Sequence, residues 1–412
     1  MAQYDFKKEG IDVRELALVD KIIDESLRKG FPGGQLLIEI AGKAVYERSF
    51  GSVVLEKCHL TEEAGFNFER GPMVTASTLF DIASLTKIFA TTYLFQKYIE
   101  EEPALLTRTL ADFFPELLKR YEECTNASVG DISLKALLSH HAGFEPNPLF
   151  YDPTYSASLY CQNRAAFPEV LLKAPLIHPV GSVGLYSDVD FMLLTYVLEK
   201  IGGEGLEAQL QRHFWAPLGL TDIMYRPLAK GLSKDQLAAT ERAGNTRDGL
   251  YDYPNIRTEM IQGEVQDEKA YYCLEGVSGH AGLFSNARTL SKLFKLMTTP
   301  NEIFSEAIKA QFLSPHFPEK TFGLGWRLNG PDMGYMFGEN AGKDAFGHTG
   351  WTGCLATHDP ANQLTIIYLT NRKNTPVCDP AENPHLFYGD QLPAGRYRPI
   401  IQAIYHDLGI NA

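Results

Sequence analysis

Apolar residues recur along this chain with two different spacings, one helical and one strand-like. In residues 12–29 apolar positions lie three or four apart, which predicts an amphipathic helix that ends at Gly30. Residues 35–40 and 43–50 predict two strands joined by a tight turn, a β-hairpin. Residues 51–77 are rich in charge, glycine and proline, and they predict a loop.

Helical spacing dominates the middle of the chain. It predicts helices over four segments: 109–118, 132–139, 189–201 and 206–214. Residues 226–275 are irregular and polar, and the stretch 241–249 carries too much charge and glycine to form a core element. Long ordered loops of this kind are more often functional than structural in a compact domain.

Strand patterns return near the end of the chain and predict an α+β fold. Residues 322–328, 353–358 and 364–369 are the candidate strands, and 396–408 is a closing helix. This order predicts an antiparallel sheet flanked by N- and C-terminal helices, together with an α-helical lobe. We expect residues 1–412 to form one unit, with an α/β part over about 1–83 and 275–412 and a helical part over about 84–274.

Composition narrows the class of protein. The chain has 412 residues, of which 44% are hydrophobic and 22% charged, as in a globular protein with a large core. A net charge of −13 argues against nucleic acid or anionic lipid as the main partner. No stretch approaches the roughly 20 apolar residues of a membrane span. The first residues lack the apolar core of a signal peptide, so we expect a cytoplasmic protein, or a periplasmic or envelope one if an export signal was removed.

Cysteine and histidine spacing predicts neither a metal site nor a cofactor. The six cysteines are scattered without a C-x-x-C pair. That spacing favours reduced thiols over a disulfide framework or a zinc site. No arrangement of His, Asp and Glu resembles a set of metal ligands.

The strongest chemical signal is Ser84 followed three residues later by Lys87. A strand-like run precedes Ser84 and an apolar, helix-spaced segment follows it, so both side chains share one helix face. A serine hydroxyl needs a neighbouring base, and a desolvated lysine with a lowered pKa can serve as one. The helix N-terminus would also favour developing negative charge. A second S-x-x-K, residues 26–29, lies late in the first predicted helix, where we expect it at the surface.

Three further stretches carry suitable chemistry. In the glycine-rich loop 179–188, the phenol of Tyr186 can shuttle a proton between nucleophile and leaving group. The small residues of 346–353 leave a strand edge open, where substrate can lie and N–H groups can face an oxyanion. In 276–285 the glycines allow close backbone approach. His280 within that stretch is a candidate supporting residue rather than one that acts on substrate.

Together these motifs resemble the penicillin-recognising serine hydrolases, the family of class C β-lactamases and low-molecular-weight penicillin-binding proteins. Ser84–Lys87 matches the family's S-x-x-K, 186–188 stands in place of its Tyr-x-Asn, and 348–350 stands in place of its Lys-Thr-Gly. The turn 137–143 and the stretch 217–220 also match family motifs, and the resemblance covers about residues 10–410. Other stretches that carry it are 244–249, 254–258, 267–270, 277–285 and 321–327. It implies the β-lactamase/transpeptidase-like fold, with the site between sheet and helices.

The resemblance also implies roles. Ser84 would attack a carbonyl and form an acyl-enzyme, while Lys87 and Tyr186 share its proton and pass it to the leaving group. The backbone N–H groups of Ser84 and Trp351 would form the oxyanion hole, at about 3–4 kcal/mol per donor. Water, activated by Tyr186, would then release the product. Thr349 and Gly350 complete the substrate-binding strand.

Two residues depart from the family pattern and bear on the substrate. His348 replaces a lysine that holds the substrate carboxylate in relatives, and histidine is mostly neutral at pH 7. Asp188 replaces an amide that can donate to substrate. It could compensate by keeping His348 protonated or by holding Lys87. Tyr253, in a literal Tyr-x-Asn, rivals Tyr186, but the sequence around Tyr186 fits the family better.

The functional hypotheses from sequence are therefore these. The first is a serine hydrolase acting as a D-alanyl-D-alanine carboxypeptidase on peptidoglycan peptides. The second is an esterase, a β-lactamase or a muramoyl-peptide amidase on the same scaffold. The third is a non-catalytic penicillin- or peptide-binding sensor. The expected partner is a small peptide, β-lactam or ester, and the sequence leaves the oligomeric state open.

Overall fold

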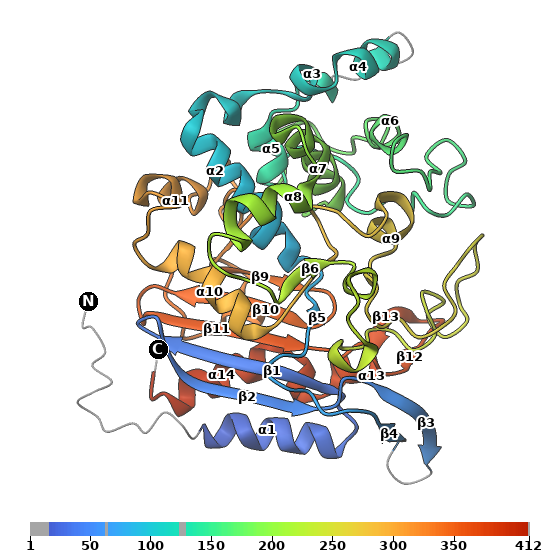
Figure 1. Ribbon diagram of the computed structural model, residues 1–412, viewed down its shortest axis with the longest axis vertical. Helices are drawn as coiled ribbons and strands as arrows, with labels where there is room; N and C mark the ends of the chain where they lie inside the picture. Colours follow the sequence, from blue (N-terminus) through green and yellow to red (C-terminus); the bar gives the residue numbers. More distant parts are fainter. Residues whose placement is uncertain (1–15, 62–64, 123–128, 411–412) are drawn as a thin grey trace.

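A six-stranded antiparallel sheet forms the centre of the molecule. The structure, a computed structural model, describes residues 16–61, 65–122 and 129–410. The strand order is β2-β1-β11-β10-β9-β8 (Figure 1). The strands are β1 (Gly33–Ile40), β2 (Lys43–Gly51), β8 (Arg327–Leu328), β9 (Phe346–Gly350), β10 (Cys354–Asp359) and β11 (Leu364–Thr370).

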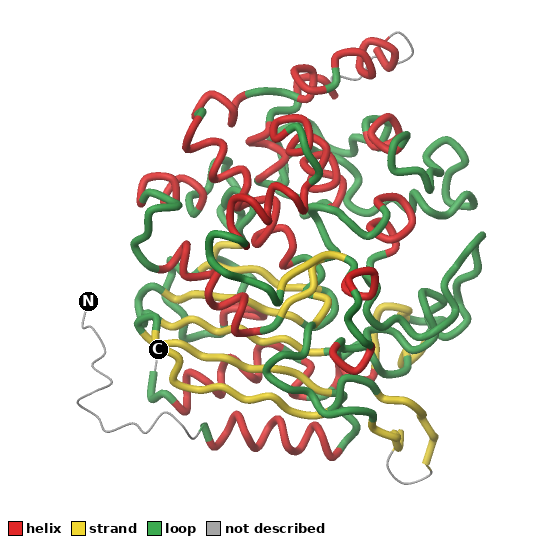
Figure 2. The backbone as a smooth tube through the Cα atoms, viewed as in Figure 1, coloured by secondary structure: helices red, strands yellow, loops and turns green. Residues whose placement is uncertain are grey.

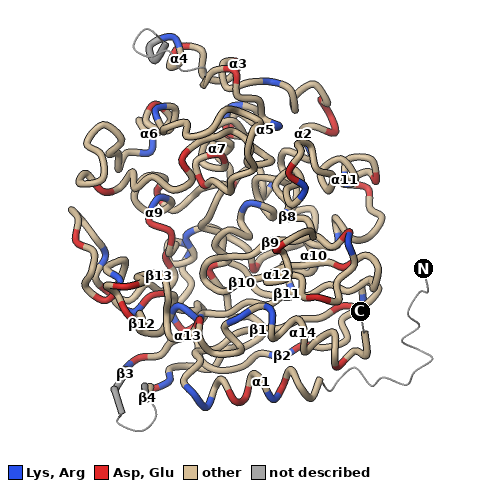
Figure 3. The backbone as a smooth tube through the Cα atoms, turned by 180° about the vertical axis from the view of Figure 1, so that it is seen from behind, with Lys and Arg blue, Asp and Glu red and all other residues tan. Residues whose placement is uncertain are grey.

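One face of the sheet packs against the first and last described helices, α1 (Ala17–Arg28) and α14 (Tyr397–Asp407). Figure 2 shows both helices on the side of the sheet away from the helical lobe. These two helices are joined directly, because Asp407 Oδ2 accepts hydrogen bonds from the N–H groups of Leu18 and Val19 at 2.8 and 3.1 Å. Acidic and basic residues intersperse along α1 (Figure 3), as an outward helix face requires.

The other face carries α10 (Ala287–Thr298) and, beyond it, the helical lobe. Side chains alternate along β1 accordingly: Leu36 and Ile38 join the α1/α14 cluster and Leu37 joins the large core of the lobe. The lobe and its connections contain α2 (Tyr93–Glu101), α3 (Leu110–Phe113), α4 (Pro115–Glu122), α5 (Leu134–Leu138), α6 (Phe167–Leu171), α7 (Asp188–Gly202), α8 (Leu206–Leu210), α9 (Glu268–Leu274) and α11 (Glu306–Phe312).

A small second sheet leads the chain into the lobe. Its strand order is β5-β7-β6, formed by Phe80–Asp81, Leu283–Ser285 and Ile223–Tyr225. From β5 the chain turns directly into a π-helical segment, Lys87–Thr92, that continues as α2. This is the segment for which the sequence predicted a helix starting at Ser84.

These observations confirm the predicted α+β fold, the hairpin of 35–40 with 43–50, and the helices predicted over 132–139, 189–201 and 206–214. The single helix predicted over 109–118 is instead two helices, α3 and α4, which are interrupted at Phe114. The division into an α/β part and a helical part stays a prediction. The predicted start of the first helix, at residue 12, lies outside the described residues.

Three further local predictions are wrong. The expected loop 51–77 contains a hairpin, β3 (Leu55–Thr61) with β4 (Gly65–Arg70), set apart from the main sheet, so its sequence lacks a strong two-residue period. In 322–328 only Arg327–Leu328 is a strand. Ser26 is buried rather than at the surface, and its hydroxyl accepts from the N–H of Ala394 at 3.1 Å.

Two further features of the described residues concern membrane-spanning helices and the state of the cysteines. Across the described ranges, no helix combines the length and the apolar character needed to cross a membrane. Cys161, Cys273, Cys354 and Cys378 are free thiols.

Candidate active site

Ser84 lies at a strained turn between β5 and the helix that follows. Ala83, just before it, has a φ of 46°, a left-handed conformation that is uncommon outside glycine. The buried carboxylate of Asp81 fixes this turn by accepting from the N–H of Ala83 at 2.9 Å and of Gln266 at 2.7 Å. Burial raises the pKa of Asp81 to about 6. The turn thus presents Ser84 to a cleft while the chain on both sides of it is buried.

Lys87 is fully buried one turn after Ser84. Its Nζ donates to Ser84 Oγ at 3.1 Å, to Asp188 Oδ1 at 2.7 Å and to the carbonyl of His280 at 3.3 Å. Burial lowers the pKa of Lys87, but the negative charge of Asp188 and the interaction with Tyr186 raise it by more. The expectation of a lowered lysine pKa is therefore wrong: in the resting enzyme Lys87 is an ammonium ion held by Asp188.

Tyr186 is the tyrosine that lies beside this pair. The Lys87 Nζ lies 4.6 Å from the centre of its ring. Burial raises the pKa of Tyr186, and interactions with Lys87 and Ser84 lower it in part. Tyr253, the rival in the literal Tyr-x-Asn, lines the same cleft but packs against Tyr151, with ring centres 5.0 Å apart.

His348 is buried in β9 and neutral. Its Nδ1 lies 2.7 Å from the carbonyl oxygen of Thr349, which only accepts, so Nδ1 carries the proton. Burial and the nearby Lys87 charge lower the pKa of His348 to about 3. Asp188 was expected either to keep His348 protonated or to hold Lys87. The structure shows that it holds Lys87.

The end of β9 brings Gly350 and Trp351 against the Ser84 turn. A Cβ on Gly350 would lie 2.5 Å from the carbonyl oxygen of Ile82, so only glycine allows this approach. Ser84 and Trp351 both line the cleft, and within the described residues neither backbone N–H has an acceptor. Two N–H donors therefore remain available to an oxyanion. Thr349 pairs with Leu355 in the ladder.

Trp351 is itself held by charges. Its ring centre lies 5.2 Å from the guanidinium of Arg247 and 4.2 Å from the ammonium of Lys373. Arg247 is buried and paired with Glu268 at 2.7 Å and with Glu241. As predicted, the segment 241–249 forms no helix or strand of the core, but part of it is buried because Arg247 pairs with Glu241 and Glu268.

The cleft that these elements enclose has a volume of about 480 Å³. Ser84, Tyr186, Asp188 and Trp351 lie in its wall, and its other walls come partly from the polar segment 226–275 and partly from residues 146–152 and His385. Those further lining residues include Asn147, Tyr151, Arg247, Tyr251, Tyr253, Asp267, Glu268, Lys269 and His385.

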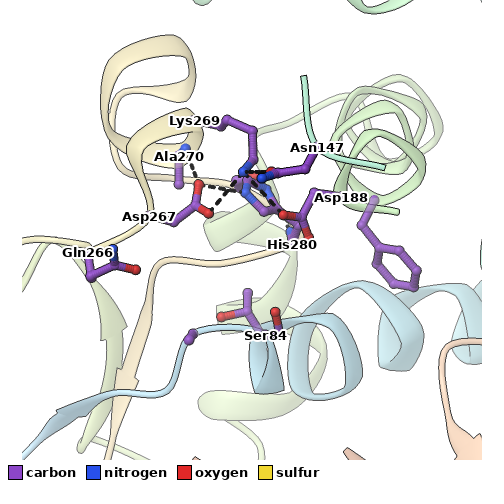
Figure 4. Close-up of polar contacts among 12 residues, drawn as sticks. Ser84, Asn147, Asp188, Gln266, Asp267, Lys269, Ala270 and His280 are labelled. Carbon is purple, nitrogen blue, oxygen red and sulfur yellow. Dashed lines mark hydrogen bonds and ion pairs between the residues drawn. The ribbon is translucent and has the colours of Figure 1, made fainter. Parts of the chain in front are cut away.

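Sequence reasoning missed a second buried lysine. Lys269 Nζ lies 3.3 Å from Asp188 Oδ2 and 3.4 Å from Asp267 Oδ2, and it donates to Asn147 Oδ1 (Figure 4). His280 supports this cluster rather than Ser84, because its Nε2 donates to Asp267 Oδ1 at 2.8 Å. The only sequence signal was that 267–270 formed part of the family resemblance.

The same cluster contains residue types that bind metals. Donor atoms of Asp188, Asp267 and His280 lie within 4.8 Å of one another. The ammonium of Lys269 bridges the two carboxylates, so a lysine takes the place that a bound cation would need.

Comparison with known proteins agrees with the fold. A model of the Beta-lactamase family matches residues 19–390. The N-acetylmuramyl-L-alanine amidase of Bacillus subtilis (strain 168) is 38% identical over 95% of this chain and 89% of the relative. A putative D-alanyl-D-alanine carboxypeptidase of Escherichia coli (strain K12) is 35% identical over 97% of this chain and 92% of the relative.

Solved structures with low sequence identity share the fold. EstCE1, a hydrolase with promiscuous acyltransferase activity, is 20% identical with a TM-score of 0.67, over 95% of this chain and 98% of that one. A penicillin-binding protein homologue from Caulobacter crescentus is 19% identical with a TM-score of 0.60, over 95% of this chain and 97% of that one. With a family match over nearly its whole length and relatives above 30% identity, the chain belongs to the Beta-lactamase family of serine hydrolases.

Proposed function

We propose that the protein is a serine amidohydrolase of peptidoglycan peptides that cleaves the amide bond between N-acetylmuramic acid and L-alanine. The observation that carries the choice of bond is the neutral, buried His348 beside an anionic Asp188. The relative named N-acetylmuramyl-L-alanine amidase, 38% identical over 95% of this chain, supports it.

The chemistry follows from the contacts of Ser84. After the Lys87–Tyr186 pair loses one proton, it accepts the proton of Ser84 while Oγ attacks the amide carbonyl. The N–H groups of Ser84 and Trp351 stabilise the oxyanion. The pair then returns the proton to the leaving amine, the carbon–nitrogen bond breaks, and a muramyl ester remains on Ser84. Water attacks this ester, and Ser84 regains its proton.

The charges around the cleft favour a bond without a carboxylate next to it. A terminal D-Ala-D-Ala bond has a free carboxylate one residue away, which calls for a cation to bind it. His348 offers none, and the lysine and arginine that line the cleft, Lys269 and Arg247, are each paired with two carboxylates. The muramyl amide bond carries no such charge.

D-alanyl-D-alanine carboxypeptidase activity is the second candidate. The E. coli relative that carries this name in putative form aligns with 97% of this chain, so it supports the same acyl-enzyme route on a different bond. Both candidates use Ser84, Lys87 and Tyr186 in the same way.

Product analysis separates the two. The purified protein is incubated with N-acetylmuramyl-L-alanyl-D-isoglutamine and, separately, with a pentapeptide ending in D-Ala-D-Ala, and products are identified by mass spectrometry. We expect N-acetylmuramic acid and free dipeptide from the first substrate, and neither from the Ser84→Ala variant. Release of D-alanine alone would establish the second candidate instead, and turnover by Ser84→Ala would overturn the serine mechanism.

A further inference from the structure

We propose that Lys269 is a positioning residue of the reaction: bridged to Lys87 by Asp188, it supplies the positive charge that allows the Lys87–Tyr186 pair to release a proton. The proposal rests on the proposed serine mechanism but not on which amide bond is cleaved. Lys269 does not touch Ser84, and it acts through the carboxylate that the two lysines share.

The geometry makes Asp188 a bridge between two ammonium groups. Its Oδ1 is 2.7 Å from Lys87 Nζ and its Oδ2 is 3.3 Å from Lys269 Nζ. Lys269 is 5% exposed at its side chain and Lys87 is fully buried, so solvent screens this interaction little. The charge on Lys269 is therefore offset by the two carboxylates that it contacts, Asp188 and Asp267, rather than by solvent.

Besides Asp188, two further side chains hold the ammonium group of Lys269. Asn147 Oδ1 accepts from it, and Asp267 Oδ2 lies 3.4 Å away. Asp267 is fixed in turn, because its Oδ1 accepts from the N–H of Ala270 at 2.8 Å and from His280 Nε2 at 2.8 Å. Figure 4 shows these side chains converging above Ser84. The ammonium group cannot turn away from Asp188 without losing these partners.

A second cation is needed because an aspartate stands at position 188. Alone, the Asp188 carboxylate would hold Lys87 as an ammonium ion and make the loss of its proton costly. Lys269 shares that carboxylate and offsets part of its charge. The proton belongs to the Lys87–Tyr186 pair rather than to either residue, so Lys269 favours its release whichever of the two holds it.

Other charged and titratable groups also face the pair, and they are the same in all variants below. Burial lowers the pKa values of His140 and His348 and so favours their neutral forms, and burial raises the pKa of Asp190. Arg327, from β8, is a cation. On the far side of Lys269, Asp267 and His280 complete the set.

The test is the pH dependence of Ser84 reactivity, measured between pH 5 and pH 10 as the rate of p-nitrophenyl acetate hydrolysis and of covalent labelling by a fluorophosphonate probe. Lys269→Gln removes the charge and keeps a hydrogen-bond donor. Lys269→Met is a second neutral variant, and Lys269→Arg keeps the charge. Lys343→Met is the control: it changes a lysine that is 79% exposed and forms its ion pair with its neighbour Asp344.

In the neutral variants we expect the acidic limb of the rate profile to move up by about one to two pH units, with a matching ten- to hundredfold loss below the limb and recovery at high pH. Lys269→Arg and Lys343→Met should keep the parental limb. A neutral variant that melts like the parent but keeps the parental limb, or that loses activity equally at all pH values, overturns the proposal. If both neutral variants are unfolded, a shifted limb in Lys269→Arg overturns it. Neither probe contains a muramyl amide, so failure of the proposed substrate leaves this test intact.

Discussion

Replacement of Gly350 by alanine should displace Ser84 while the reacting side chains, Ser84, Lys87 and Tyr186, are kept. The added Cβ would lie 2.5 Å from the carbonyl oxygen of Ile82, whereas real contacts of this kind are essentially never shorter than 3.0 Å. It would also lie 3.3 Å from the Cβ of Ala83. The chain must therefore open by at least 0.5 Å, the difference between 3.0 and 2.5 Å, immediately before Ser84.

The cost should fall mainly on the rate. A displacement of about 1 Å in an active site lowers the rate by up to about 100-fold, so we expect kcat/KM for p-nitrophenyl acetate to fall about 10- to 100-fold. Overpacking typically costs about 1–3 kcal/mol of stability, so the melting temperature should fall by a few degrees while the variant stays folded. The measurements are ester hydrolysis and thermal unfolding followed by circular dichroism.

The matched control is Gly334→Ala. A Cβ on Gly334, the first residue of α12 (Gly334–Phe337), meets nothing within 4 Å. Activity should be unchanged and the melting temperature equal or slightly higher, because alanine favours a helix. If Gly350→Ala hydrolysed the ester within twofold of the parent rate, the close approach of β9 to the Ser84 turn would not control the position of the nucleophile.

Three further outcomes are expected. Ser84→Ala should abolish hydrolysis and covalent labelling by a fluorescent penicillin or a fluorophosphonate. Lys87→Met should slow acylation about 10²- to 10⁴-fold. Labelling of the Ser84→Ala variant, seen by mass spectrometry, would contradict the mechanism. His280→Ala should retain measurable acylation of ester, because His280 bonds Asp267 rather than Ser84, and a variant inactive toward ester would refute this. The folded-state pKa of His348 is about 3 against an ordinary 6.5, so between these values only the unfolded chain binds the proton and stability falls as the pH drops. His348→Gln should therefore lose less melting temperature than the parent between pH 7 and pH 5, and an equal loss would show that His348 is charged.

The local parts of the fold were predictable because their signals are local. The hairpin of β1 and β2 shows its strands and turn within one short stretch, residues 33–51. Helix α7 shows a long apolar run that ends at Gly203 in the left-handed conformation. The pairing of Ser84 with Lys87 is likewise set by a spacing of three residues. The β3–β4 hairpin was not predicted, because it forms a separate two-stranded sheet in a stretch whose charge, glycine and proline content is typical of a loop.

The charge interactions of the site could not be predicted from the sequence. Lys87, Asp188 and Lys269 come from three separate segments, and only the packing of α7 and α9 around the π-helical segment brings them together. The raised pKa of Lys87 follows from that meeting and from nothing near Lys87 in sequence. In the same way, no spacing in the sequence pairs Arg247 with both Glu241 and Glu268, which the fold brings to it.

Because Asp407 bonds the start of α1, helix α1 can complete its packing only after the last part of the chain has been synthesised. Asp407 accepts from amides at the start of α1 that lie 388 and 389 residues earlier, and β1 pairs with β11 across a similar stretch of chain. A ribosome synthesises at about 5–20 residues per second, so the first helix waits tens of seconds for these partners. During that interval its apolar stripe is uncovered, which makes this layer the place where chaperone protection would matter most.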